Sequence, residues 1–218
     1  MGFFDSFFGW LPAGIQAVLV WLAQTTGNAG VAIILLTVLV RLLLFPLTRK
    51  QTQSMLAMKE LQPKLLEIQK KYKDKPEEYN RRVLELYREK GVNPFGGCLP
   101  VLIQLPVLYA LFTVLRTYTF EGVGAGFLIW TLTDPDPTYL LPILSGVTTY
   151  FMSAMTSTGD PSQKMMLYIM PVFLAWISIQ FPSGLVLYWV VNNIFSIAQQ
   201  YVLSKTMAPA VEGGAKAK

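Results

Sequence analysis

Five runs of about twenty mostly apolar residues follow one another along the chain, each long enough to cross a bilayer as an α-helix. They predict an all-α, polytopic membrane protein with transmembrane helices at 29–48, 97–118, 138–157, 166–181 and 184–204. Before the first span, apolar side chains recur at helical spacing within 12–26, which predicts an amphipathic helix in the N-terminal segment 1–28. The pattern leaves open whether this helix lies on the membrane surface or forms a short re-entrant segment.

The segment between the first two spans, 49–94, has a different pattern. An apolar residue returns every three or four positions on either side of a break at Pro76, among charged and polar residues. This predicts two amphipathic helices joined by a turn, that is, a helical hairpin held off the membrane. Partly covered apolar faces would make the hairpin mobile and able to dock other proteins. A solvated spacer with ordinary charge pairs is the alternative.

The basic residues are distributed very unevenly about these spans. Of the eighteen Lys and Arg residues, twelve lie in 49–94 and four more lie in 158–165 and the tail 205–218. With five spans these segments share one side, and the positive-inside rule places them in the cytosol. The N-terminal segment and the loop 119–137, which carries Glu121, Asp134 and Asp136, are then extracytoplasmic. The predicted orientation is N-terminus outside and C-terminus inside.

Arg41 is the single charged residue within the first apolar run. A charge at the centre of a bilayer costs about 2.5–3.5 kcal/mol on insertion scales, so its guanidinium is expected to face a water-filled cavity between helices. At about 1.5 Å per residue, polar residues of other spans fall at a similar depth, in the inner half of the bilayer. The predicted cavity residues are Thr37, Arg41, Gln104, Thr149, Ser153, Thr156, Asn192 and Ser196.

Because the outer halves of the spans are mostly apolar, this cavity should open to the cytosol and be closed on the outside. Two plainer interpretations remain. The arginine could snorkel to the membrane surface, and the hydroxyl and amide side chains could simply join helices, at about 0.6 kcal/mol per contact.

Composition narrows the function. The chain is 53% hydrophobic, has no histidine and has one cysteine, and none of the predicted spans contains an acidic residue. An intramembrane protease needs a Ser–His pair, paired aspartates or a zinc site, so we expect no enzyme activity, no metal and no cofactor. A small-anion transporter that uses Arg41, and a structural scaffold for membrane protein assembly, remain alternatives.

Three stretches of the chain resemble a known family. They are Arg41-Leu-Leu-Leu-Phe-Pro46-Leu-Thr48, Asn93-Pro-Phe-Gly-Gly-Cys98-Leu-Pro100-Val-Leu-Ile-Gln104-Leu-Pro106, and Phe181-Pro-Ser-Gly184-Leu-Val-Leu-Tyr188-Trp189. Their sequence and order are similar to those of the YidC/Oxa membrane protein insertases. The resemblance implies a multi-pass protein of the bacterial plasma membrane that moves hydrophobic segments from the cytosol into lipid.

The resemblance also implies roles for individual residues. Arg41 would be the groove arginine that attracts acidic residues of the substrate, Tyr188 and Trp189 would line the substrate's path, and 49–94 would capture substrates. Spans two and four would form an apolar slide. The expected slide residues are Leu102, Leu105, Met166, Met170 and Phe173.

The implied partners are newly made membrane proteins and the lipid bilayer, not nucleic acid. The ribosome, the signal recognition pathway and the Sec translocon are further candidates, although a short, lightly basic tail gives little support for ribosome docking. The chain departs from Gram-negative members of the family in that we expect it to lack their large extracytoplasmic domain. Some members have a glutamine on the groove face of the third span, where this chain offers Ser153 and Thr156.

Overall fold

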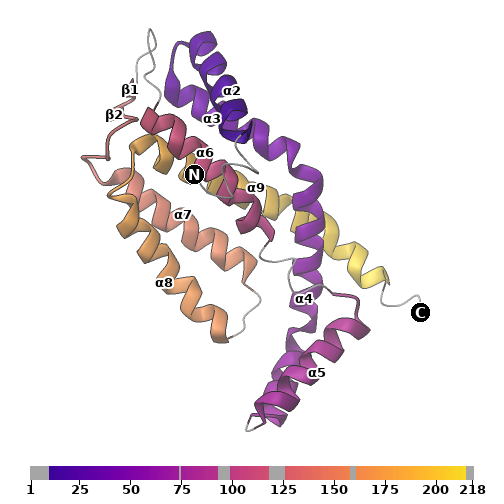
Figure 1. Cartoon of the computed structure of the whole chain (residues 1–218). Coiled ribbons are helices and arrows are strands. Elements are labelled where there is room, and N and C mark those ends of the chain that lie inside the picture. The colour runs from indigo at the N-terminus through magenta and orange to yellow at the C-terminus, as the bar shows by residue number, and fades with distance from the viewer. Residues whose placement is uncertain (1–9, 74, 93–98, 118–125, 158–160, 215–218) are drawn as a thin grey trace.

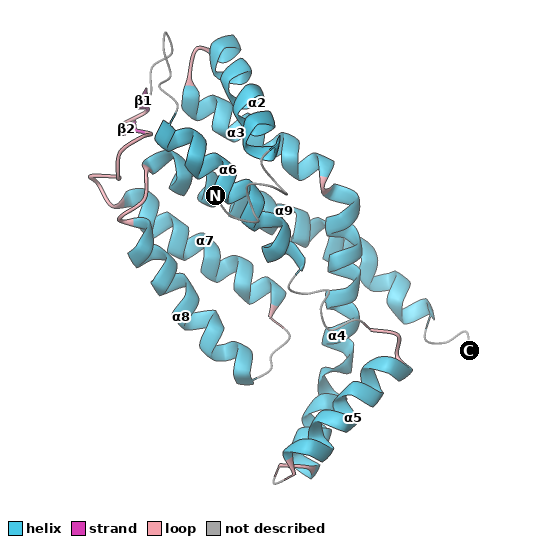
Figure 2. Ribbon diagram, in the orientation of Figure 1, coloured by secondary structure: helices cyan, strands magenta, loops and turns pink. Residues whose placement is uncertain are grey.

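A computed structural model describes residues 10–73, 75–92, 99–117, 126–157 and 161–214. Within this part of the chain the fold is almost entirely helical, as predicted, with one two-stranded antiparallel hairpin (Figures 1 and 2). The elements are α2 (Trp10–Thr26), α3 (Ala29–Leu43), α4 (Phe45–Lys71), α5 (Pro76–Glu89), α6 (Leu99–Thr117), β1 (Gly126–Phe127), β2 (Trp130–Thr131), α7 (Leu140–Thr156), α8 (Pro161–Ser178) and α9 (Ser183–Gly214).

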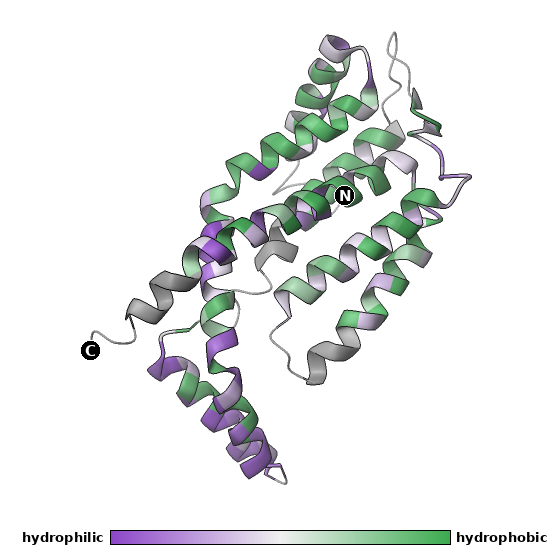
Figure 3. Cartoon of the chain, turned by 180° about the vertical axis from the view of Figure 1, so that it is seen from behind, coloured by the Kyte–Doolittle hydropathy of each residue, from purple (hydrophilic) through white to green (hydrophobic). Residues whose placement is uncertain are grey.

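Most of the helices form a bundle in which α9 is central. It contacts α3, α4, α6 and α7, while α7 also packs along α8, and α2 packs on α3 and α6. Helices α4 and α5 pack on each other and project from one end of the bundle (Figure 1). Hydrophilic residues concentrate on this projecting pair, whereas the bundle helices are largely hydrophobic (Figure 3). The two helices predicted within 49–94 are thus present.

The helix predicted over 29–48 is divided in the structure. Helix α3 ends at Leu43, and α4 begins at Phe45 after a bend of 64°. Pro46 explains the break, because it has no N–H to donate to the carbonyl of Leu42 and its ring would clash with that carbonyl. Among the described helices none alone meets a length-and-hydropathy criterion for a membrane span, whereas α3 and α4 meet it jointly.

Helix α9 is longer than the predicted span 184–204, since it continues to Gly214. Residues 185–206 contain neither Pro nor Gly, so nothing in the sequence breaks the helix there. The apolar run ends where polar residues begin, but polarity does not end a helix.

The apolar core lies at the end of the bundle away from the α4–α5 hairpin. It joins α2, α3, α6, β2 and the start of α9, through residues such as Leu19, Ile33, Leu111 and Leu187. The loop after β2 fastens this end. The carbonyl oxygens of Leu132 and Asp134 accept hydrogen bonds from the N–H groups of Gly184 (2.9 Å) and Ser183 (2.7 Å). These bonds satisfy donors at the start of α9 that have no partner within the helix.

Buried side chains change character along α9. Leu185, Val186 and Leu187 are buried at its start, within the apolar core. From residue 192 to residue 200 the buried side chains are all polar: Asn192, Asn193, Ser196, Gln199 and Gln200. This polar stretch of α9 meets α4, where the hydroxyl of Thr52 donates a hydrogen bond to Oε1 of Gln200.

Candidate functional site

Arg41 lies in the last turn of α3 and lines a small cavity between α3, α4, α6 and α9. Its Nε donates a hydrogen bond to Oδ1 of Asn192, on α9, at 2.8 Å. The cavity has a volume of about 40 Å³, which is enough for a few water molecules. The lining side chains are Val40, Arg41, Leu44, Leu47, Thr48, Gln51, Gln104, Val107 and Asn192.

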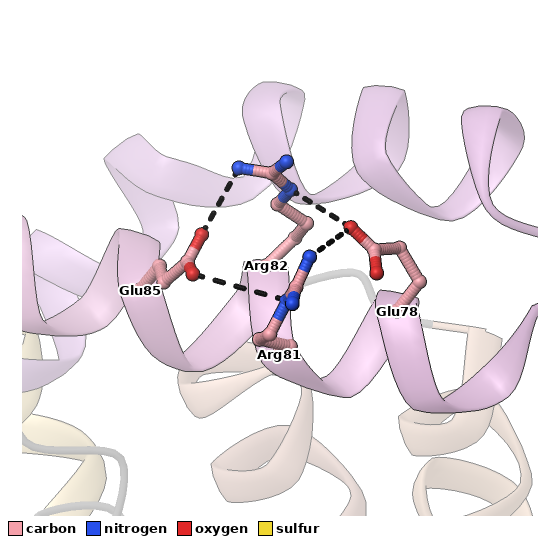
Figure 4. Close-up of polar contacts among 4 residues, drawn as sticks. All are labelled: Glu78, Arg81, Arg82 and Glu85. Atoms are coloured by element: carbon pink, nitrogen blue, oxygen red, sulfur yellow. Dashed lines mark hydrogen bonds and ion pairs between the residues drawn. The ribbon is translucent and has the colours of Figure 1, made fainter.

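The charge of Arg41 has no ionic partner in the part of the chain that the structure describes. The ion pairs found there all lie on α5, where Arg81 and Arg82 bridge Glu78 and Glu85 at 2.7–4.0 Å on an exposed face (Figure 4). Arg41 instead contacts neutral polar groups, and its side chain is half-buried. The cavity therefore keeps one positive charge that no described carboxylate neutralises.

Gln104 brings a second polar group from α6. It lines the cavity, and its Nε2 donates a hydrogen bond to the hydroxyl of Tyr188. Tyr188 is 2% exposed, so it lies behind Gln104 and is not itself part of the lining. Its role in the structure is to hold the Gln104 amide in place.

A separate polar cluster joins α7 to α9. Nδ2 of Asn193 donates to the hydroxyls of Thr149 (2.9 Å) and Thr148 (3.2 Å), and Nε1 of Trp189 donates to the Thr149 hydroxyl (3.2 Å). None of these residues lines the Arg41 cavity. In this arrangement Thr149 and Trp189 connect helices, which fits the helix-joining alternative for them.

Three of the other predicted cavity residues donate hydrogen bonds to backbone carbonyls of their own helices. Thr37 donates to the carbonyl of Ile33 (2.7 Å), Ser196 to that of Asn192 (2.6 Å) and Thr156 to that of Met152 (3.0 Å). Ser153 is half-buried on α7 and outside the lining. Of the predicted set, the structure thus gathers Arg41, Gln104 and Asn192 around one cavity.

The predicted slide residues lie on two helices. Leu105 is exposed on α6, and Met170 and Phe173 are exposed on α8. The side chains of Leu102 and Met166 lie outside the described part of the structure. Exposure of large apolar side chains suits contact with lipid as well as contact with an apolar substrate helix.

Sequence reasoning missed Thr48 and Gln51, which line the cavity from the first turns of α4. Thr48 and Gln51 are three positions apart, on one face of α4. The bend at Leu44 turns that face toward Arg41, which the spacing along the chain does not show. Thr52 extends the contact, since its hydroxyl donates to Oε1 of Gln200 on α9 at 2.9 Å.

Comparison with known proteins shows the family of the chain. The family model of the 60Kd inner membrane protein matches residues 21–210. The chain belongs to this family. A membrane protein insertase YidC from Fusobacterium nucleatum is 43% identical over 196 residues, which cover 88% of this chain and 95% of the relative. One from Caldanaerobacter subterraneus is 46% identical over 179 residues, covering 82% of this chain and 86% of the relative.

Longer relatives match over part of their length. The chain is 42% identical over 204 residues to the membrane protein insertase YidC of Citrifermentans bemidjiense, covering 92% of this chain and 38% of that protein. A solved structure described as an active YidC insertase with its first transmembrane domain resolved shares the fold. Its TM-score is 0.72 at 38% identity, over 92% of this chain and 47% of the solved one. The family resemblance expected from the sequence is confirmed.

Proposed function

We propose that the chain is a membrane protein insertase that admits the polar tail of a hydrophobic segment into the Arg41 cavity and releases the segment into the bilayer. The observation that carries the proposal is a cationic side chain in a polar cavity between helices, without a carboxylate partner among the described residues. The names of the close relatives support the same function. The proposed activity includes no chemical step.

The physical basis is the cost of moving a polar tail through hydrocarbon, where each backbone N–H and C=O loses its water. A cavity that holds water part of the way across shortens the dry path. Arg41 adds attraction for acidic side chains, which is stronger at low dielectric than in bulk water. We propose that the cavity opens toward the cytosol, because the buried side chains of α9 between residues 192 and 200 are polar and lie toward the charged hairpin, whereas residues 185–188 belong to the apolar core.

Other elements have roles within the same proposal. The α4–α5 hairpin would meet substrates first, and the exposed apolar side chains Leu105, Met170 and Phe173 would contact the hydrophobic part of the substrate as it enters lipid. Newly made membrane proteins in a bacterial plasma membrane are the proposed substrates. We propose the ribosome, the signal recognition pathway and the Sec translocon as further partners.

The test is insertion into liposomes that contain only the purified protein. The substrate is a single-span protein with a short acidic N-terminal tail, and protease protection of that tail is the readout. We expect protection above that of empty liposomes. Arg41→Ala should reduce it by about tenfold, the equivalent of about 1.4 kcal/mol of lost attraction, whereas Arg41→Lys should restore most of it because the charge is kept.

A matched substrate whose tail carries Asn and Gln in place of Asp and Glu is the control. It should be much less sensitive to Arg41→Ala, since only the charged tail gains from the guanidinium. A transporter would instead lose anion uptake with Arg41→Ala, and a scaffold would be unaffected. No protection above empty liposomes with either substrate would contradict an autonomous insertase.

A further inference from the structure

The partner that holds Arg41 is a neutral amide. Arginine only donates hydrogen bonds, so the group of Asn192 that faces its Nε is the carbonyl oxygen Oδ1, at 2.8 Å. Asn192 is 8% exposed on α9, which packs against α3. The bond joins residues 151 positions apart in sequence, and it ties the last turn of α3 to the first third of α9.

This bond uses one donor of the guanidinium and leaves the others. Arginine has five N–H donors in a rigid planar fork, and Nε carries one of them. The two Nη groups, with the remaining four, have no acceptor among the described residues. The edge formed by two parallel N–H groups is the one that binds a carboxylate in bidentate fashion, and holding Nε fixes the plane of that edge.

We propose that Asn192 is the positioning and specificity residue for Arg41. It orients the guanidinium through Nε, and because it is uncharged it leaves the full positive charge for a carboxylate of the substrate tail. This inference rests on the proposed insertase function. It assigns Asn192 a role through Arg41 and not as a direct contact of the substrate.

The alternative side chain that would fix the guanidinium is a carboxylate, which would form an ion pair at the same place. Aspartate has nearly the shape of asparagine, and it would bind Nε with a charge-assisted hydrogen bond. Such a pair would hold Arg41 at least as firmly but would cancel its charge. A neutral side chain at residue 192 therefore orients the Arg41 guanidinium without cancelling its charge. Asn192→Asp keeps the contact and changes only the charge, so it tests this point.

The adjacent Asn193 is a matched control. It is equally buried, at 8% exposed, but its amide bonds Thr148 and Thr149 on α7 and not Arg41. Asn193→Ala removes an interhelical contact of the same chemistry. It should change the insertion of acidic-tailed and neutral-tailed substrates by the same factor.

The experiment measures insertion of both substrates into liposomes with each variant, and the readout is the ratio of acidic-tailed to neutral-tailed insertion. Asn192→Asp should lower this ratio by about tenfold, close to the value for Arg41→Ala. Asn192→Ala keeps the charge but frees the side chain, so it should lower the ratio by about threefold, the cost of ordering one long side chain and less than the effect of Asn192→Asp. Equal thermal unfolding in detergent confirms that Asn192→Asp is folded.

Repeating the Asn192→Ala measurement in an Arg41→Lys protein distinguishes orientation of the Arg41 guanidinium from a general effect on the structure. The lysine ammonium is a point charge with no planar fork to orient, so in an Arg41→Lys protein the substitution Asn192→Ala should leave the ratio unchanged. If the ratio falls as much in that background as in the native one, or if Asn192→Asp leaves it unchanged in native protein, Asn192 does not act through Arg41. These results would leave the insertase function standing, whereas that function itself fails if native protein inserts neither substrate.

Discussion

At the scale of single residues, Asp136 shows how one carboxylate organises the loop before α7. Its Oδ1 accepts hydrogen bonds from the backbone N–H of Thr138 (2.8 Å) and from the Thr138 hydroxyl (2.6 Å), and its Oδ2 accepts one from the N–H of Leu141 (2.7 Å). The last of these satisfies a donor in the first turn of α7, where a negative charge also suits the helix dipole. Burial alone would raise the pKa of this carboxyl, but the hydrogen bonds outweigh burial and the pKa lies below its usual value.

A lowered pKa makes the contribution of Asp136 dependent on pH. The carboxylate stabilises the fold above its unfolded pKa of about 3.9, and this contribution is lost as the pH falls through the lower pKa of the folded state. Asp136→Asn should reduce the free energy of unfolding by about 1–2 kcal/mol at pH 7. The difference from native protein should shrink below about pH 4.

Thermal unfolding in detergent at several pH values between 7 and 3 measures this difference. Asp134→Asn is the control, because Asp134 serves Ser183 through its backbone carbonyl, which the substitution keeps. A difference between native and Asp136→Asn protein that stays constant down to pH 3 would show that the carboxylate charge contributes nothing.

At the scale of elements, a polar seam joins the projecting hairpin to the bundle. The buried Thr52 on α4 donates to Gln200 on α9, and Lys59 on α4 donates to the carbonyl of Met155 near the end of α7, at 2.6 Å. Beside Gln200, both amide atoms of Gln199 are buried with no partner among the described residues. Since unpaired buried polar groups cost about 1–3 kcal/mol each, this part of α9 should contribute less to stability than the apolar core.

The Thr52–Gln200 bond gives a test of the seam. Thr52→Val leaves the buried Gln200 oxygen unpaired, so it should destabilise the packing of α4 on α9 by about 1–3 kcal/mol. Adding Gln200→Leu removes the orphaned group, and the double variant should regain most of the loss. Hydrogen exchange of the α4 backbone, compared among native, single and double variants, reports this directly. Equal exchange in the native and Thr52→Val proteins would show that the bond does not hold the seam.

The sequence predicts the positions of these helices and strands to different degrees, because different features determine where each one begins and ends. Apolar periodicity located the helices, because burial of one face follows from local spacing alone. It placed the end of the first helix at Thr48, since hydropathy does not register the break that Pro46 imposes at Leu44. The strands β1 and β2 are two residues each, too short for any alternation to reveal.

The same limit applies to the site. Arg41 could be predicted because a charge in an apolar run is conspicuous by itself. Thr149 and Asn192 were both assigned to the cavity by depth, but Thr149 meets Asn193 and Trp189 whereas Asn192 meets Arg41. Spacing gives the face of a helix and its depth, while the neighbour of that face depends on how distant helices pack.

At the scale of the whole molecule, polar and charged residues gather toward one end. The buried side chains of α9 between residues 192 and 200 are polar, and hydrophilic residues concentrate on the projecting α4–α5 pair (Figure 3). An insertase with a one-sided cavity would need this polar end together with the apolar core at the opposite end, because the core blocks ions and the charged hairpin stays in water. The polar end should therefore face the cytosol, the side that the positive-inside rule assigns to the hairpin.

Cysteine labelling tests this orientation. In a Cys98→Ser background, Leu128→Cys places a thiol beside the β1–β2 hairpin, at a position 81% exposed, and Lys75→Cys places one at the exposed turn between α4 and α5. A membrane-impermeant maleimide added to intact spheroplasts should label the first and not the second, while permeabilised membranes should label both. The Cys98→Ser protein without a new cysteine sets the background. Labelling of Lys75→Cys in intact spheroplasts would show that the hairpin lies outside the cytosol, and the predicted orientation would then be wrong.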